Sequence, residues 1–121
     1  MSKSNRKNDA MIPENVTFIE EAARDFKRLD GSAKPIVLKA IKKTAQNPRP
    51  NTEGGYGKPL GSHSSSDLTG FLKIKIKSTG HRIVYQYIKD KDGMRIIIIS
   101  IRDEEKVYKE AEKRIREIGE K

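Results

Sequence analysis

Apolar and polar residues alternate most regularly between residues 70 and 102, where the pattern predicts three β-strands joined by two turns. In FLKIKIK leucine and isoleucine alternate with Lys73, Lys75 and Lys77, which is the period of a strand with one dry and one wet face. An Asp-Gly pair is a strong hairpin signal, and β-branched and aromatic residues favour strands. The predicted strands and turns are, in chain order, 71–77, 78–80, 81–88, 91–93 and 94–102.

The length of the first turn decides which residues share a face. A two-residue turn at Thr79-Gly80 places Lys77 opposite Arg82 and Lys75 opposite Val84. A three-residue turn moves the arginine to the apolar side, because a slip of one residue reverses every side chain. Burying a charge is the costlier arrangement, so we favour the shorter turn. The cationic face then holds Lys73, Lys75, Lys77 and Arg82. On the last strand, alternation places Arg102 on the same face as Ser100 and Ile98. Alternation alone does not determine which face of the sheet this is.

The segments that precede and follow these strands in the sequence are predicted to form helices. An apolar stripe predicts a helix over 20–29, and a second one begins after Ser32 as N-cap and ends before Pro48. We expect the two to form an antiparallel hairpin on the sheet. A third helix covers 104–118, with i,i+4 pairs such as Glu105–Lys109 and Glu110–Arg114. Residues 15–19 suggest a short edge strand, and 48–70, rich in glycine, proline and serine, suggest a loop. The fold class expected is α+β, with a mainly antiparallel sheet of about four strands.

Length and composition bound the kind of protein. The 121 residues suffice for one domain, which we assign to 13–121, after a flexible N-terminal extension over 1–12. The chain has no cysteine, so no disulfide or thiolate metal site is available. No apolar run approaches the roughly 20 residues of a membrane helix, and the N-terminus lacks the apolar core of a signal peptide. A soluble cytoplasmic protein is expected.

Charge is concentrated on the predicted sheet. The net charge is +9, and residues 69–102 contribute eight bases against two acids. A localised basic surface favours a polyanionic partner such as nucleic acid. The competing interpretation is a solvated strand face, on which lysine protects against edge pairing. Charge alone leaves these two interpretations equally open.

The inventory of reactive side chains is narrow. There are two histidines, His63 and His81, neither in a metal-ligand spacing, and no phosphate-binding or nucleophile motif occurs. A catalyst here would use lysine, arginine and tyrosine. Cleavage of RNA by its own 2′-hydroxyl suits this set, because it needs no metal or cofactor. It needs a proton acceptor, a proton donor and positive charge around the phosphorane. Cations held close together lower one another's pKa, so that a clustered lysine can act as a base.

Two sequence blocks carry a resemblance. FLKIKIKSTGHRIVYQYI, followed by Arg102 and by KVYKEAEKRI, resembles the RelE-type toxins of bacterial toxin–antitoxin pairs, and the likeness covers roughly 14–118. It implies the compact RelE-like fold and an endoribonuclease that cleaves mRNA in the ribosomal A site. It also implies a cognate antitoxin as protein partner and no cofactor.

The resemblance assigns roles by position. Of the two strand lysines one is the general base and the other holds phosphate. The arginine after the turn stabilises the transition state, and the arginine ending the last strand is a proton donor or leaving-group stabiliser. The tyrosine of the last helix stacks on or orients the target nucleotide. A lysine and a histidine near the turn contact RNA, although relatives often have tyrosine in place of the histidine. The two strand lysines are Lys73 and Lys75, the arginine after the turn is Arg82, and the arginine that ends the last strand is Arg102. The tyrosine is Tyr108, and the lysine and histidine near the turn are Lys77 and His81.

Two alternatives remain. ParE-type toxins share the fold, lack this basic set and act on DNA gyrase, and a non-catalytic RNA-binding module would use the same surface without turnover. Tyr85 and Tyr87 are expected in the core.

Overall fold

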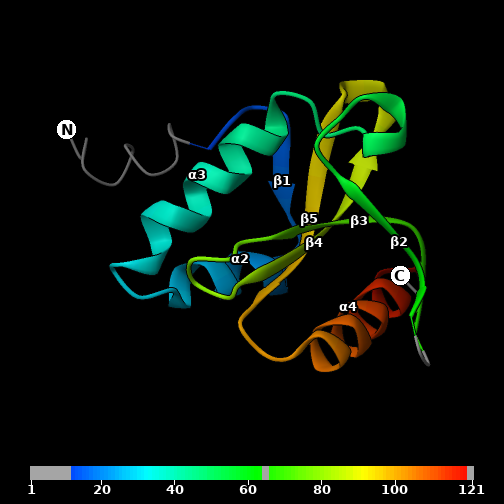
Figure 1. The fold of residues 1–121 in the computed structure, drawn as a ribbon. Coiled ribbons are helices and arrows are strands. Elements are labelled where there is room, and N and C mark those ends of the chain that lie inside the picture. The colour runs from blue at the N-terminus through cyan, green and yellow to red at the C-terminus, as the bar shows by residue number, and fades with distance from the viewer. Residues whose placement is uncertain (1–11, 64–65, 120–121) are drawn as a thin grey trace.

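The computed structural model describes residues 12–63 and 66–119, in which one five-stranded sheet is flanked by three α-helices (Figure 1). This agrees with the α+β class expected from the sequence. All but the last residue of the predicted extension 1–12 lie outside the described residues. No helix in the described ranges is long and apolar enough to cross a membrane. The elements are β1 (Val16–Phe18), α2 (Glu20–Arg28), α3 (Ala33–Ala45), β2 (Lys58–His63), β3 (Ser66–Lys75), β4 (Arg82–Ile88), β5 (Gly93–Ser100) and α4 (Glu104–Gly119).

The strands lie in the order β1-β5-β4-β3-β2. All neighbours are antiparallel except β1, which pairs in parallel with β5 from Val16 opposite Met94. The predicted edge strand is therefore confirmed. A Cβ on Gly93 would lie 2.4 Å from the carbonyl oxygen of Asn15, so glycine is required where the two strands meet.

The prediction of a loop over 48–70 is wrong for its second half. Lys58–His63 forms edge strand β2, and β3 already begins at Ser66. Pro59 and Gly61 weaken the local strand signal and occur where the β2–β3 register shifts. The strand nevertheless buries Leu60 against the core, and this gain comes from tertiary contacts that local propensity does not report.

The helices lie on both faces of the sheet, as Figure 1 shows for α3 and α4. The hydroxyl of buried Tyr85 donates to the carbonyl oxygen of Pro48 at 2.8 Å, which places the end of α3 on the Tyr85 face. The opposite face is covered by α4, whose Val107, Tyr108 and Ala111 are buried. Both predicted i,i+4 pairs of α4 form.

The start of α3 differs from the prediction in one detail. Ser32 precedes the helix but makes no side-chain cap hydrogen bond. The carboxylate of Asp30 accepts from the hydroxyl and backbone N–H of Ser32 and from the N–H of Ala33 instead. These hydrogen bonds lower the pKa of Asp30. Asp30 therefore supplies the cap of α3 that the sequence assigned to Ser32.

An ion pair anchors α4 to the edge of the sheet. Strand β1 ends at Phe18, opposite Ile96, and beyond it two side chains take the place of a strand. The carboxylate of Asp25 on α2 accepts from the N–H of Ile99, and Arg114 donates to the carbonyl oxygen of Ile97 at 2.9 Å. Arg114 also contacts Asp25 at 2.7 Å, and both side chains are nearly buried. The pair joins α2, β5 and α4.

Candidate active site

The β3–β4 turn sets the register of the basic face. Lys75 lies opposite Arg82 and Lys73 opposite Val84, so the predicted pairing of Lys77 with Arg82 is wrong by two residues. The turn is longer than two residues, because the backbone N–H of Ile76 donates to the carbonyl oxygen of His81 at 2.9 Å. Lys77 lies beyond the end of β3, exposed in the turn.

A shift of two residues leaves every side chain on its predicted face. Lys73, Lys75 and Arg82 therefore share one side of the sheet, the side on which α4 packs. Lys75 is exposed and Lys73 half-buried. The Arg82 side chain, 17% exposed, lies between β4 and the start of α4 and not in the core under α3. The structure thus brings these three cations together.

Arg82 is oriented by the segment that joins β5 to α4. Its Nη1 donates to the carbonyl oxygen of Arg102 at 3.3 Å, and its Nε lies 3.9 Å from the Glu104 carboxylate. A guanidinium has five N–H donors in a rigid fork, so these contacts leave donors for a phosphate. The arrangement holds a fixed positive charge beside Lys75.

Tyr108 lies beneath Lys73. The ammonium of Lys73 is 5.8 Å from the centroid of the Tyr108 ring, in the range of a cation–π contact. The tyrosine is 1% exposed. Burial, and to a smaller extent the charge of Glu104, raises the pKa of Tyr108 to about 12, while the charge of Arg82 acts in the opposite direction. The predicted stacking of Tyr108 on a nucleotide does not fit this position, because neither ring face is accessible. Its ring contacts the Lys73 ammonium.

Arg102 follows the last strand. Because Ser100 lies opposite Arg82 and Ile98 opposite Val84, the face that the sequence left open for this part of β5 is the basic face. The N–H of Arg102 donates to the Ser100 hydroxyl at 3.2 Å. Its exposed side chain lines a cavity of about 320 Å³ between α2, β5 and α4.

His81 is placed differently from the prediction that it contacts RNA. It lies opposite Ile76, on the face away from Lys75, and is only 8% exposed. Its Nδ1 lies 2.8 Å from the Thr79 hydroxyl. The sequence contained a signal for this burial, because His81 has the same parity as the core residues Ile83 and Tyr85. This placement does not favour an RNA contact by His81.

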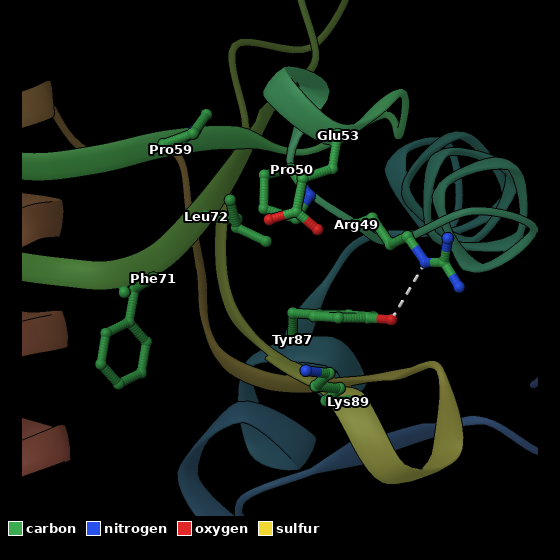
Figure 2. A pocket seen from close by; sticks show the side chains of 9 residues that line it. Arg49, Pro50, Glu53, Pro59, Phe71, Leu72, Tyr87 and Lys89 are labelled. Atoms are coloured by element: carbon green, nitrogen blue, oxygen red, sulfur yellow. Dashed lines mark hydrogen bonds between the residues drawn. The ribbon is translucent and has the colours of Figure 1, made fainter.

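A larger cavity, of about 600 Å³, lies on the other face of the sheet (Figure 2). Tyr87 borders it, and its hydroxyl donates to Asp92 and accepts from Arg49 Nε at 3.2 Å. Tyr87 is only partly buried, whereas Tyr85 is in the core as predicted. Leu72 and Tyr87 face away from the lysines by parity, so this cavity is not part of the basic site. Among the residues described by the structure, no group of three or more histidine, aspartate or glutamate side chains is placed to hold a metal.

Comparison with known proteins agrees with this architecture. A family model described as the ParE toxin of the type II toxin–antitoxin system parDE matches residues 16–108. The mRNA interferase toxin RelE of Escherichia coli (strain K12) is 30% identical over 98 residues, which cover 81% of this chain and 93% of RelE.

Two solved structures are similar over most of the chain. The crystal structure of isolated E. coli RelE has a TM-score of 0.58 at 27% identity and covers 83% of this chain and 96% of that one. A mutant E. coli RelE in complex with a peptide of the antitoxin RelB also has a TM-score of 0.58, at 25% identity, covering 79% of this chain and 90% of that one.

Fold and basic face together define a small α+β protein with the architecture of the RelE toxin. The chain belongs to the RelE/ParE family of toxins of type II toxin–antitoxin systems.

Proposed function

We propose that this chain is a toxin that cleaves mRNA in the ribosomal A site. One observation carries the proposal: the β3–β4 register places Lys73, Lys75 and Arg82 on one face of the sheet. The relative RelE is named an mRNA interferase, which supports the same reaction here. Action on translating ribosomes implies that the chain works in the cytoplasm.

The reaction proposed is attack of the 2′-hydroxyl on the adjacent phosphate. The 2′-oxygen bonds to phosphorus while its proton passes to a base, and the bond to the 5′-oxygen breaks as that oxygen takes a proton from water. The products are a 2′,3′-cyclic phosphate and a 5′-hydroxyl. Each proton transfer from a positioned side chain contributes roughly 10²–10⁴-fold.

The contacts divide the roles within the basic face. Lys75 is exposed and opposite Arg82, so we assign it as proton acceptor. Lys73 is held over the Tyr108 ring, and we assign its ammonium to the phosphate oxygens. Arg82, oriented by the Arg102 carbonyl, stabilises the charge that develops on the phosphorane.

Three further residues have supporting roles in this proposal. Arg102, at the end of β5, stabilises the leaving group. Tyr108 is a positioning residue that acts through Lys73. Lys77, exposed in the turn, attracts the RNA chain electrostatically.

A cognate antitoxin is the protein partner that we infer. E. coli RelE has been solved with a peptide of its antitoxin RelB, and this chain covers 90% of that toxin chain. Affinity purification of this chain, co-expressed with the adjacent gene of its operon, should recover a small second protein. Purification of the chain alone would count against the partner.

Inhibition of DNA gyrase is the second candidate, because the matching family model describes ParE. The basic cluster favours RNA cleavage, since a protein that only binds another protein has no need of three cations on one face. A supercoiling assay with purified gyrase discriminates between the two. Inhibited gyrase with intact mRNA would support the ParE-like activity, whereas binding to ribosomes without cutting would indicate a non-catalytic RNA-binding module.

Primer extension on mRNA in a translating extract tests the proposal directly. We expect cuts at codon-related positions, dependent on ribosomes, with 5′-hydroxyl ends that polynucleotide kinase labels without prior phosphatase treatment. Lys73→Ala, Arg82→Ala and Arg102→Ala should each restore growth on expression, with unchanged circular dichroism. Lys42→Ala, an exposed change on α3, is the matched control and should stay toxic. Full toxicity of all three variants would overturn the mechanism.

A further inference from the structure

We propose that Arg28, Arg102 and Lys106 form a second phosphate-binding site, which holds a phosphodiester next to the one that is cleaved. The inference rests on the proposed function and deepens it. It adds Arg28 and Lys106, residues to which neither the sequence pattern nor the family resemblance assigns a role.

The site is the cavity of about 320 Å³ between α2, β5 and α4. Arg28 ends α2, Arg102 follows β5, and Lys106 is in the first turn of α4. All three side chains are exposed, so their charged groups are accessible to a ligand. Residues more than 70 positions apart in the sequence therefore place cations around one cavity. Arginine forks match phosphate oxygens in pairs.

Both carboxylates that line the cavity are ion-paired to Arg114. Asp25 accepts from Arg114 and from the N–H of Ile99, and Glu110 accepts from Arg114 Nε at 3.1 Å. One nearly buried guanidinium thus contacts both acids of the lining. With Arg28 and Arg102 included, the lining of the cavity contains four cations and two carboxylates. The cavity is therefore net positive and suited to an anion.

Lys106 also has an acidic neighbour outside the cavity. Its ammonium lies 3.8 Å from the carboxylate of Asp103, and both side chains are about 60% exposed. Exposed pairs of this kind contribute little, so the ammonium can turn to a phosphate at small cost.

The cavity adjoins the basic face. Ser100 lines it and lies opposite Arg82 in the β4–β5 ladder. Arg82 donates to the backbone carbonyl of Arg102. Neighbouring strands are about 4.8 Å apart, so an RNA chain with its scissile phosphate at Arg82 can place the next phosphate in the cavity.

Binding to ribosomes programmed with a synthetic mRNA tests the site. The mRNA carries a 2′-deoxy nucleotide at the cut position, so that affinity is measured without cleavage. We expect Arg28→Ala/Lys106→Ala to weaken binding about tenfold and to lower the slope of log affinity against log salt by about one for each phosphate that is no longer bound. With cleavable mRNA, we expect the double variant to have a higher KM than the wild type, while its kcat stays within about twofold. Lys42→Ala/Lys39→Ala removes the same charge from the exposed side of α3 and should change neither quantity by more than about twofold.

Neutral phosphates identify the ligand. We place a methylphosphonate, in turn, at each position flanking the cut. At one of these positions it should weaken mRNA binding by the wild type several-fold, whereas at no position should it further weaken binding by the double variant. Equal weakening of both proteins at every position would overturn the inference. Binding of inorganic phosphate alone, with no contribution of the cavity to mRNA affinity, would also overturn it and would mark an adventitious anion site.

The two proposals fail separately. If the wild type cleaves and the double variant matches the control in affinity and salt slope, the second phosphate site is wrong and the nuclease stands. If the wild type binds but leaves cleavable mRNA intact, the nuclease is wrong, while the affinity comparison still decides the phosphate site. Unchanged urea midpoints in both variants exclude a loss of fold.

Discussion

Lys75 and Arg82 lie directly opposite each other in the β3–β4 ladder. Like charges at directly opposite positions destabilise a sheet. The fold maintains this repulsion on the face where the proposed reaction needs positive charge. The relationship therefore predicts a conflict between stability and activity at this pair.

Lys75→Glu should separate stability from activity. An acid opposite Arg82 replaces repulsion with attraction, so we expect the free energy of unfolding to rise by roughly 0.5 kcal/mol, while mRNA cleavage is lost. Urea denaturation and primer extension measure the two quantities. Lys77→Glu, in the exposed turn, should leave stability unchanged. A Lys75→Glu protein less stable than the wild type would contradict the cross-strand argument.

Arg82 should not be replaceable by lysine. Lysine keeps the charge but lacks the fork that reaches the Arg102 carbonyl and a phosphate together. We expect Arg82→Lys to lose about 100-fold or more of the cleavage rate, close to the loss in Arg82→Ala. Single-turnover cleavage on saturating ribosomes measures this rate. Near wild-type activity of the lysine variant would show that charge alone is sufficient.

The Tyr108 ring should matter more than its hydroxyl. Tyr108→Phe keeps the ring under Lys73, so we expect cleavage within about tenfold of the wild type. Tyr108→Leu removes the cation–π contact, which is worth about 0.5–2 kcal/mol, and should cleave more slowly than Tyr108→Phe. Single-turnover rates at equal folded fractions, set from urea curves, provide the comparison. Equal rates in the two variants would remove the positioning role.

The buried phenols should make the fold sensitive to alkali. An unfolded tyrosine ionises near about pH 10, whereas burial raises the pKa of Tyr108 to about 12 and that of Tyr85 further. Between these values the unfolded chain has released protons that the folded chain still holds, so stability is full below pH 10 and falls above it. Tyr108→Phe should reduce the fall in urea midpoint between pH 9 and 11. The urea midpoint of Tyr56→Phe, a change at an exposed position, should fall over this pH range as much as that of the wild type. Parallel curves for all three proteins would be evidence against the burial argument.

The Asp25–Arg114 pair should account for much of the attachment of α4. Asp25→Ala leaves a nearly buried guanidinium without its main partner and should cost about 3 kcal/mol. Arg116→Ala, an exposed change on the same helix, should cost less than about 0.5 kcal/mol. Urea denaturation measures both, and amide exchange should show faster opening of α4 in the first variant only. Equal costs would mean that the apolar stripe alone holds the helix.

Some features were predictable from the sequence because they depend on local period. Alternation in FLKIKIK placed Lys73 and Lys75 on one face whatever the exact pairing, since an even shift preserves parity. The helices at 20–28 and 104–119 followed from apolar stripes and i,i+4 charges that a short window contains. The same parity, applied to His81, would have predicted its burial.

Other features depended on contacts between distant segments. The turn length that pairs Lys75 with Arg82, and not Lys77, is selected by the packing of the whole ladder. Strand β2 exists because Leu60 finds a core, although Pro59 and Gly61 disfavour it locally.

The sequence by itself determined which residues are cationic, which strand carries them and which side of that strand they occupy, because side-chain alternation is a property of a single strand. Only the tertiary structure decided that Tyr108 lies under Lys73, that His81 is buried, and that Arg28 and Lys106 meet Arg102 at one cavity. These relations join residues far apart in the chain, and their distances are set by how α2, β5 and α4 pack together.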